Sequence, residues 1–169
     1  AIGATCNGVR VWSVYCPNGR EPSHDHYRYK LEWFTALNVT AKSEIADHPD
    51  LPFAVIGDYN IAPTDEDVWD IEKFVDSTHV TLAERAALTD LEAMGLIETV
   101  PRSLKGEPYT FWDYRNGSFH RGWGMRIDLV YGNQVFTSLV QDSYVDRDAR
   151  KGKGASDHAP VVVDLDLSV

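Results

Sequence analysis

The chain has 169 residues, 43% of them hydrophobic, and a formal net charge of -10. This length and composition predict one soluble globular domain with a real core and exclude a disordered chain. No apolar run reaches the length of a membrane span, so we expect no membrane partner. Two cysteines are too few for a disulfide framework, which predicts a reducing, cytoplasmic location. The acidic balance argues against binding nucleic acid by overall charge, but it allows a local basic face or a divalent metal held by carboxylates.

The first part of the chain predicts a hairpin, a helix and a buried strand. Asn7 and Gly8 form a turn signal between two strand-like arms, residues 1–6 and 9–15. The run 53–56 is apolar throughout, as in a strand covered on both faces, and Gly57 ends it. Between them lies a helical stripe that consists of Tyr27, Leu31, Phe34, Leu37, Ala41 and Ile45.

Further elements follow the central strand. Thr64 and Asp67 mark a helix start, and Thr81 with Glu84 forms a capping box for a helix that runs to Met94 and is ended by Gly95. Apolar runs predict further strands at residues 109–112, 125–131, 135–145 and 161–165.

Polar side chains stand at the ends of these strands. Asp58 and Asn60 are two residues apart, so they point to one side if the strand geometry persists. There they are placed to orient a water or hold a phosphate oxygen, although they equally fit a simple turn. Asp128 is a lone acid in an apolar run and needs a partner. His158 is a candidate partner, since a buried carboxylate fixes an imidazole tautomer and favours its charged form.

The loop at residues 113–124 mixes arginine, aromatic residues and glycine. Such a loop is either a structural corner or a surface that contacts phosphates with arginine and wedges aromatic rings against bases. The candidates for DNA contact are Arg115, Phe119, Arg121 and Trp123.

Four segments, residues 15–19, 57–65, 126–129 and 156–160, occur in the order of the later motifs of a known family. They resemble exonuclease III, the branch of the exonuclease/endonuclease/phosphatase superfamily that includes the abasic-site endonucleases. The resemblance implies an α/β (α+β) fold, part of a four-layer sandwich in which helices flank two packed β-sheets. It also implies that residues 1–169 are the C-terminal part of a single domain whose first half is missing. We therefore expect an uncovered sheet face, with possible self-association through it.

The resemblance also implies roles for individual residues. Asp58 would act in proton transfer, with Asn60 orienting it and the phosphate. Tyr15 would place its hydroxyl on the scissile phosphate. His158 would donate to a phosphate oxygen and be held by Asp128. Such a site neutralises the charge of a phosphodiester transition state and positions an in-line water.

A divalent metal, Mg²⁺ or Mn²⁺, is the cofactor that the resemblance implies, and Asp157 would lie near it. The predicted metal-binding set is Asp58, Asn60, Asp157 and His158. The predicted activity is that of a metal-dependent exodeoxyribonuclease and abasic-site endonuclease of base-excision repair, acting on DNA with abasic sites or 3′ ends. The alternatives are a phosphoesterase for small phosphodiesters and an inactive half-domain that only binds a partner.

Overall fold

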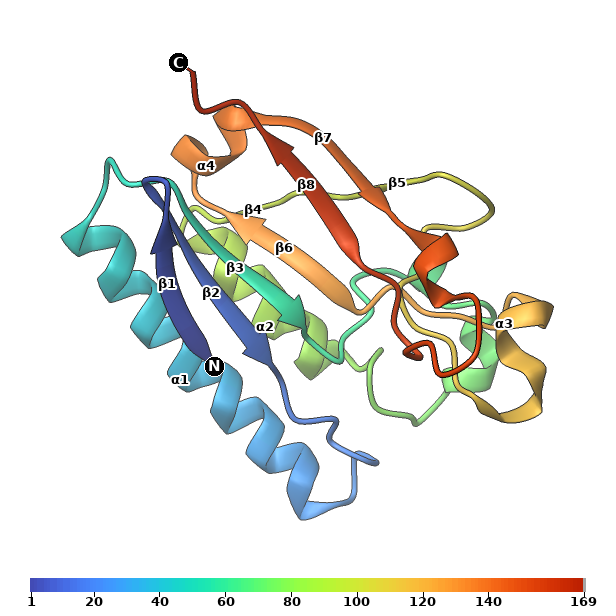
Figure 1. Ribbon diagram of the computed structural model, residues 1–169. Helices are drawn as coiled ribbons and strands as arrows, with labels where there is room; N and C mark the ends of the chain where they lie inside the picture. The colour runs from blue at the N-terminus through green and yellow to red at the C-terminus, as the bar shows by residue number, and fades with distance from the viewer. Residues whose placement is uncertain (169) are drawn as a thin grey trace.

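The structure is a computed structural model that describes residues 1–168 (Figure 1). Its strands are β1 Ile2–Cys6, β2 Val9–Tyr15, β3 Phe53–Asp58, β4 Ile97–Glu98, β5 Arg102–Ser103, β6 Asp128–Gly132, β7 Val140–Val145 and β8 Val161–Leu165. Its helices are α1 Asp25–Asp47, α2 Leu82–Ala93, α3 Ser118–Arg121 and α4 Gln134–Leu139.

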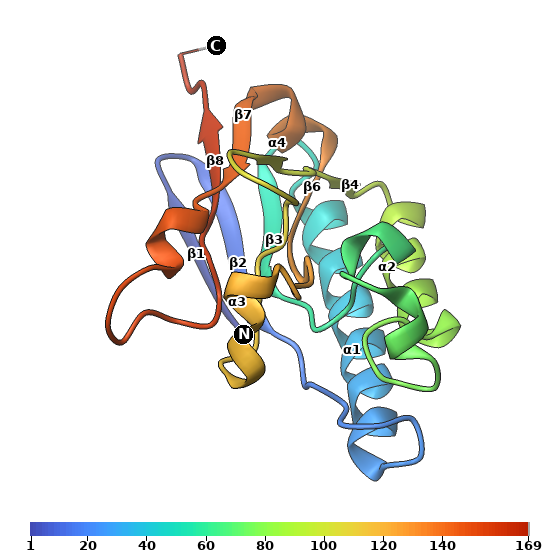
Figure 2. The same cartoon turned by 90° about the vertical axis from the view of Figure 1, so that its right-hand side faces the viewer.

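The described residues form two sheets. A five-stranded sheet has the order β1-β2-β3-β6-β4, and a three-stranded sheet has the order β5-β7-β8. Helices α1 and α2 cover one face of the larger sheet, and strands β7 and β8 pack on its other side (Figure 2). The predicted α/β architecture of two packed sheets flanked by helices is confirmed.

The central strand is buried as its sequence indicates. Phe53, Ala54 and Val55 are at most 1% exposed, because helices cover one face of β3 and the second sheet covers the other. The predicted hairpin of β1 and β2 is present, and β2 runs parallel to β3 while β6 runs antiparallel to it. This pairing brings the carboxyl-terminal ends of β2 and β3 beside the start of β6.

The helices differ from the prediction in one respect. The buried face of α1 carries Lys30 together with Phe34, Leu37 and Ala41. Tyr27 and Leu31, which the predicted stripe included, are only half-buried. The capping box of α2 is confirmed in both directions, with Thr81 accepting from the Glu84 amide and Glu84 accepting from the Thr81 amide. In the described residues, no helix has the length and apolar character needed to cross a membrane.

Two predicted strands are shorter than their apolar runs suggest. Residues 109–112 form only isolated bridges, in which Phe111 pairs with Met125 and with His158. The run 125–131 enters the sheet only at Asp128, because the amide of Arg126 donates to the carbonyl of Asp67 and its side chain is drawn to the same residue. Hydrogen bonds to segments distant in the sequence, most of them between backbone groups, therefore replace a regular sheet ladder in both segments.

The predicted strand 135–145 is wrong in its first half, which is helix α4, and correct in its second half, β7. The reason lies at Asn133, whose side-chain oxygen accepts from the amide of Phe136 at 2.9 Å and caps the helix. The same oxygen accepts from the amide of Phe53, so the cap also fastens α4 to the central strand.

Gly57 is required by the close approach of β2 and β3. It has a φ of 134°, and a Cβ placed on it would lie 2.1 Å from the carbonyl oxygen of Val14. We expect Gly57→Ala to lower the free energy of unfolding by about 3 kcal/mol, through backbone strain and overpacking together. Gly8→Ala is the matched control, because Gly8 has a φ of 82° and open space around it. Denaturant unfolding measures both, and equal losses in the two variants would contradict the steric argument.

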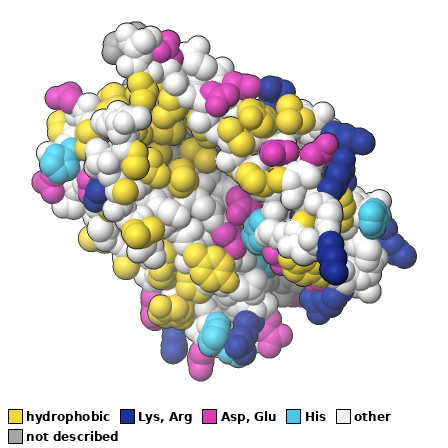
Figure 3. All heavy atoms as spheres, viewed as in Figure 1, with side chains coloured by type: hydrophobic (Ala, Val, Ile, Leu, Met, Phe, Trp, Pro, Cys, Tyr) yellow, Lys and Arg dark blue, Asp and Glu magenta, His cyan; other side chains and the backbone are white. Residues whose placement is uncertain are grey.

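An apolar groove separates part of the two sheets. It has a volume of about 550 Å³, and Val11, Ile56 and Val130 of the larger sheet face Val161 and Leu165 of β8 across it. Ser13 and all of β1 are exposed beside this groove, and hydrophobic side chains gather on this face in Figure 3. The second sheet thus covers β3 and β6 better than it covers β1 and β2. The expected uncovered sheet face is present in this partial form.

Candidate active site

The strand register places three polar side chains in one row. Tyr15 of β2 lies opposite Asp58 of β3, and Asp58 lies opposite Asp128 of β6. Residues directly opposite each other in a sheet project to the same side. Tyr15 and Asp58 line a cleft of about 610 Å³ together with Asn60, Asp157 and His158, whereas Asp128 lines the neighbouring apolar groove. The structure thus brings together all the residues that the sequence assigned to catalysis.

Asp58 and Asn60 meet through a turn and not through strand periodicity. Asn60 has a left-handed backbone, with a φ of 51°, which reverses the chain just after β3. Its amide donates to Oδ1 of Asp58 at 2.8 Å, and its side-chain nitrogen donates to Oδ2 of Asp58 at 3.0 Å. That nitrogen also donates to the carbonyl of Cys16 at 2.9 Å. The turn-building interpretation is therefore confirmed, and the turn also aims the two side chains at each other, whereas their role in catalysis stays a prediction.

The environment of Asp58 raises its affinity for a proton. Burial is the main cause, and the facing charge of Asp128 adds to it, so that the pKa of Asp58 rises to about 6. The hydrogen bond from Asn60 and the charge of His158 oppose this rise. A carboxylate with a pKa close to neutral is suited to accept and return a proton at physiological pH.

His158 and Asp128 form the predicted pair. Nδ1 of His158 lies 2.8 Å from Oδ2 of Asp128, and both side chains are partly buried. Burial works most strongly against the charged imidazolium. The hydrogen bond and charge of Asp128, with the charges of Asp58 and Asp157, outweigh it and raise the pKa of His158. Because Nδ1 is engaged by a carboxylate, Nε2 is the nitrogen left to act in the cleft.

The cleft has the character of a cation site, but the chain supplies few ligands for one. Among the described residues, no group of three or more His, Cys, Asp and Glu side chains is placed to hold a metal ion. Asp58 and Asp157 are the carboxylates of the predicted set, and both line the cleft. Two carboxylates fit an ion that keeps water and phosphate ligands, as Mg²⁺ does. His158, favoured in its charged form, suits ligation poorly because a metal binds neutral imidazole.

The loop predicted to contact DNA divides into exposed cations and packed aromatic rings. Phe119 packs edge-on against Trp112, and the guanidinium groups of Arg147 and Arg150 lie over its ring at 4.3 and 5.2 Å. Trp123 stacks on Trp69 at 4.8 Å. The two rings thus pack against neighbouring side chains while staying partly exposed, and their contact with DNA stays a prediction.

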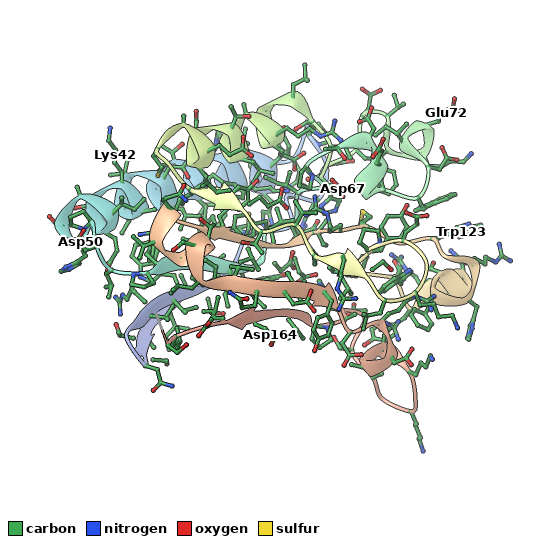
Figure 4. All side chains as sticks on the ribbon, turned by 90° about the horizontal axis from the view of Figure 1, so that it is seen from above. Lys42, Asp50, Asp67, Glu72, Trp123 and Asp164 are labelled. Carbon is green, nitrogen blue, oxygen red and sulfur yellow. The ribbon has the colours of Figure 1, made fainter. Side chains whose placement is uncertain are left out.

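The two predicted arginines remain accessible. The side chain of Arg115 is 84% exposed and forms a salt bridge with Asp113, and both residues line the cleft. Arg121 is exposed and covers the ring of Trp123 at 4.5 Å. Trp123 and Glu72 lie at one end of the molecule, opposite Lys42 and Asp50 (Figure 4). The loop therefore presents its cations at one end of the molecule, and Arg115 lines the same cleft as Tyr15 and Asp58.

Sequence reasoning missed a buried polar network behind Asn60. Lys30 and Glu84 are fully buried, and Nζ of Lys30 lies 2.5 Å from Oε1 of Glu84. His79 lies beside them, and burial together with the charge of Lys30 lowers its pKa to about 4. The burial of Lys30 could have been predicted from the helical spacing, because Lys30 lies four residues before Phe34 and so shares the buried face of α1.

A two-sheet α/β fold with a carboxylate and histidine cleft at its strand ends defines the class of protein to which this chain belongs. The family model described as the Endonuclease/Exonuclease/phosphatase family matches residues 2–158. The chain is therefore a member of that family, as its motifs predicted.

Individual relatives support this membership. An exodeoxyribonuclease of Streptococcus pneumoniae serotype 4 is 32% identical over 123 residues, which cover 69% of this chain and 42% of the relative. A 3′ phosphatase, NExo, from Neisseria, solved with a product DNA hairpin, is 35% identical with a TM-score of 0.90, over 97% of this chain and 63% of that one. An AP endonuclease from Archaeoglobus fulgidus is 28% identical with a TM-score of 0.88, over 98% of this chain and 64% of that one. The chain thus spans less than two thirds of each of these proteins.

Proposed function

We propose that the chain carries the catalytic row of a metal-dependent DNA phosphodiesterase, an exodeoxyribonuclease with abasic-site endonuclease activity that serves base-excision repair. The observation that carries this proposal is that Asp58, held by Asn60, and His158, held by Asp128, line one cleft. A proton acceptor and a charged hydrogen-bond donor in one cleft are the two groups that phosphodiester hydrolysis needs. The substrates that we propose are DNA with abasic sites or 3′ ends.

Each residue of the candidate site has a role in this proposal. Asp58 accepts the proton of the attacking water, because its pKa of about 6 leaves it ionised but basic at neutral pH. Asn60 fixes the carboxylate of Asp58 through its side-chain nitrogen. His158, held in place by Asp128, donates to a phosphate oxygen on which negative charge develops. Tyr15, 66% exposed at the rim, offers its hydroxyl to the same phosphate.

We propose that a divalent cation binds at Asp58, Asn60 and Asp157. When bound, such an ion neutralises phosphate charge and polarises the bond that breaks. The position of these three oxygen-bearing side chains along one cleft supports this assignment. Mg²⁺ and Mn²⁺ both prefer such oxygen ligands, and the choice between them stays a prediction.

The proposal predicts metal-dependent cleavage. With duplex DNA that contains one abasic site, we expect strand cleavage to rise with added Mg²⁺ or Mn²⁺ and to stop with a chelator. The physical reason is that, without a metal ion, the side chains of the site do not neutralise the negative charge of the phosphate. Gel analysis of the cleaved strand measures the rate. An absence of turnover at every metal concentration would contradict the proposal and favour the inactive half-domain, whose small ligand set is its main support.

A basic rim beside the cleft favours DNA over small phosphodiesters. Lys and Arg side chains gather at the right-hand edge of Figure 3, over α3 and the loop that follows β7. The loop after β7 supplies Arg147, Lys151 and Lys153, and the loop around α3 supplies Arg115 and Arg121. A small diester has no need of cations so far beyond its single phosphate, whereas a DNA strand presents one phosphate after another.

Removing two of these cations should weaken DNA binding without regard to sequence. For Arg115→Gln with Arg121→Gln, we expect the slope of log K against log salt to fall by about two, one unit for each lost phosphate contact. Fluorescence anisotropy of a labelled duplex at several salt concentrations measures the slope.

The control for net charge is Arg28→Gln with Arg102→Gln, which removes two cations from side chains that are 75% and 56% exposed. This control should leave the slope unchanged, because neither residue lines the cleft. Equal slopes in the two double variants would exclude the loop as the DNA-binding surface.

Three broader predictions remain. We propose that residues 1–169 act as the C-terminal part of a single domain, which is consistent with the share of each relative that the chain spans. We propose that the apolar groove between the sheets is covered in the working protein, and self-association through it stays a prediction. We propose a cytoplasmic location, which the free thiols of Cys6 and Cys16 and the nuclease relatives support.

A further inference from the structure

The backbone carbonyl of Asn60 is held by two donors from outside its own turn. Nζ of Lys30 donates to it at 2.6 Å, and Nδ1 of His79 lies at the same distance of 2.6 Å. A carbonyl only accepts, so Nδ1 of His79 carries the hydrogen in this contact. Asn60 needs such support, because left-handed backbone at a residue other than glycine is strained and persists only where its surroundings fix it.

Lys30 is itself held from several sides. Besides Glu84, its Nζ reaches the carbonyl of Asn18 at 3.3 Å and Oγ1 of Thr78 at 3.4 Å. Oε1 of Glu84 accepts in turn from Oγ1 of Thr78 at 2.6 Å and from the amide of His79 at 3.0 Å. The hydrogen bonds of Lys30, Glu84, Thr78 and His79 therefore form one network beside the turn that carries Asn60.

His79 closes the network toward the cleft. Its backbone is also left-handed, with a φ of 84°, and its ring lines the cleft. With Nδ1 donating to Asn60, Nε2 is left as an acceptor and lies 3.5 Å from the side-chain nitrogen of Asn18. That same nitrogen donates to Oδ1 of Asn60 at 3.1 Å. The carbonyl of Asn60 is thus held by Lys30 and His79, and its side-chain oxygen by Asn18, which the ring of His79 approaches.

We propose that Lys30, Glu84 and His79 are positioning residues for catalysis, which hold Asn60 in its left-handed conformation and so keep its side chain against Asp58. The kinetic part of this inference rests on the proposed function, whereas the part about the conformation of Asn60 does not. The three residues do not touch the substrate. They act through the carbonyl of Asn60, about which the chain turns.

Stability alone does not account for this arrangement. A fully buried ion pair often contributes no more to folding than well-packed apolar residues of similar volume, because both charges lose their hydration. What apolar residues cannot supply is a hydrogen-bond donor to the Asn60 carbonyl. The network therefore gives the turn a fixed geometry that a repacked core would lack.

The test removes both charges at once, so that no buried charge is left without a partner. In Lys30→Met with Glu84→Gln, and separately in His79→Asn, we expect kcat on abasic duplex DNA to fall about tenfold or more, as for other supporting partners of a reactive group. We expect KM to stay within about twofold, since the DNA-contacting surface is intact. Asparagine at 79 removes the ring but tolerates left-handed backbone.

A structural measurement accompanies the kinetics. The intraresidue amide-to-Hα nuclear Overhauser effect of Asn60 is strong for a positive φ, and we expect it to weaken in both variants. Ala87→Gly is the matched control, because it destabilises the same helix, α2, from a buried position without a contact to Asn60. It should lower the unfolding midpoint yet leave the Asn60 signal and kcat unchanged.

The outcomes separate the inference from the proposed function. Folded variants that keep both the strong Asn60 signal and the parental kcat overturn the positioning role. If the double variant does not fold, His79→Asn decides by the same two measurements. If the parent chain shows no turnover, the proposed function fails, and the Asn60 signal alone then supports or overturns the inference.

Discussion

Replacing Asp58 with asparagine is expected to remove turnover and, at the same time, to stabilise the folded chain at neutral pH. Loss of a positioned general base slows a reaction about 10²- to 10⁴-fold, and the same change also takes one carboxylate from the proposed cation site. Stability should rise because the ionised Asp58 is held against burial and against the charge of Asp128. Activity assays with added metal test the loss of turnover. Thermal unfolding without added metal tests the gain in stability.

The sign of the pH dependence follows from the raised pKa of Asp58, about 6 in the folded chain against an ordinary value of 3.8 for an aspartate side chain. Between these values the folded chain binds the proton more tightly, so stability falls as pH rises through this window and the penalty is complete above it. The full shift corresponds to about 3 kcal/mol, and partial access to water reduces the expected gain to about 1–2 kcal/mol.

The gain in stability of Asp58→Asn over the parent chain should therefore be seen at pH 8. It should disappear near pH 4, where Asp58 of the parent chain is protonated and uncharged as well. An increase of about 1–2 kcal/mol raises the unfolding midpoint by a few degrees in a chain of this size. Asp164→Asn makes the same change at an exposed position of β8 and should have little effect. An Asp58→Asn chain that is less stable than the parent at both pH values would contradict the argument.

The site was predictable where a residue and its function share one short segment. Asp58, Asn60 and His158 lie beside turn signals, and Asp128 is an acid in an apolar run. Each can therefore be identified as a candidate site residue from its immediate neighbours in the sequence. The same logic identified the central strand and the capping box of α2, which depend on adjacent residues. Short-range patterns carry this part of the fold because they follow from backbone and side-chain geometry alone.

The remainder depends on contacts between distant segments. The ion pair of Lys30 with Glu84 joins helices α1 and α2, and the sequence around Lys30 does not indicate that Glu84 is its partner. Arg126 leaves the predicted strand because it binds Asp67, 59 residues away, with both charges almost fully buried. Phe119 resembles a DNA wedge by its surroundings in sequence, but Arg147 and Arg150 from the loop after β7 cover its ring. Composition cannot reveal which of two distant segments will meet.

Replacing His158 with alanine is expected to reduce kcat about 10²- to 10³-fold while leaving KM for DNA nearly unchanged. In the proposed mechanism the imidazolium stabilises charge that develops on a phosphate oxygen in the transition state, and such an interaction contributes little to ground-state binding. Single-turnover cleavage of an abasic duplex, with binding measured separately, distinguishes the two effects. An equal rise in KM with kcat unchanged would instead assign His158 to substrate binding.

The partner Asp128 provides the sharper test, because it acts on the pKa of His158. Its hydrogen bond and charge are the main influences that raise this pKa against the effect of burial. In Asp128→Asn the pKa should fall, so the imidazolium is lost at a lower pH as the solution becomes more alkaline. The alkaline limb of the pH–rate profile should therefore move to lower pH, and NMR titration of the His158 ring should move with it. A limb that stays in place while the ring titration shifts would show that a group other than His158 controls the rate at high pH.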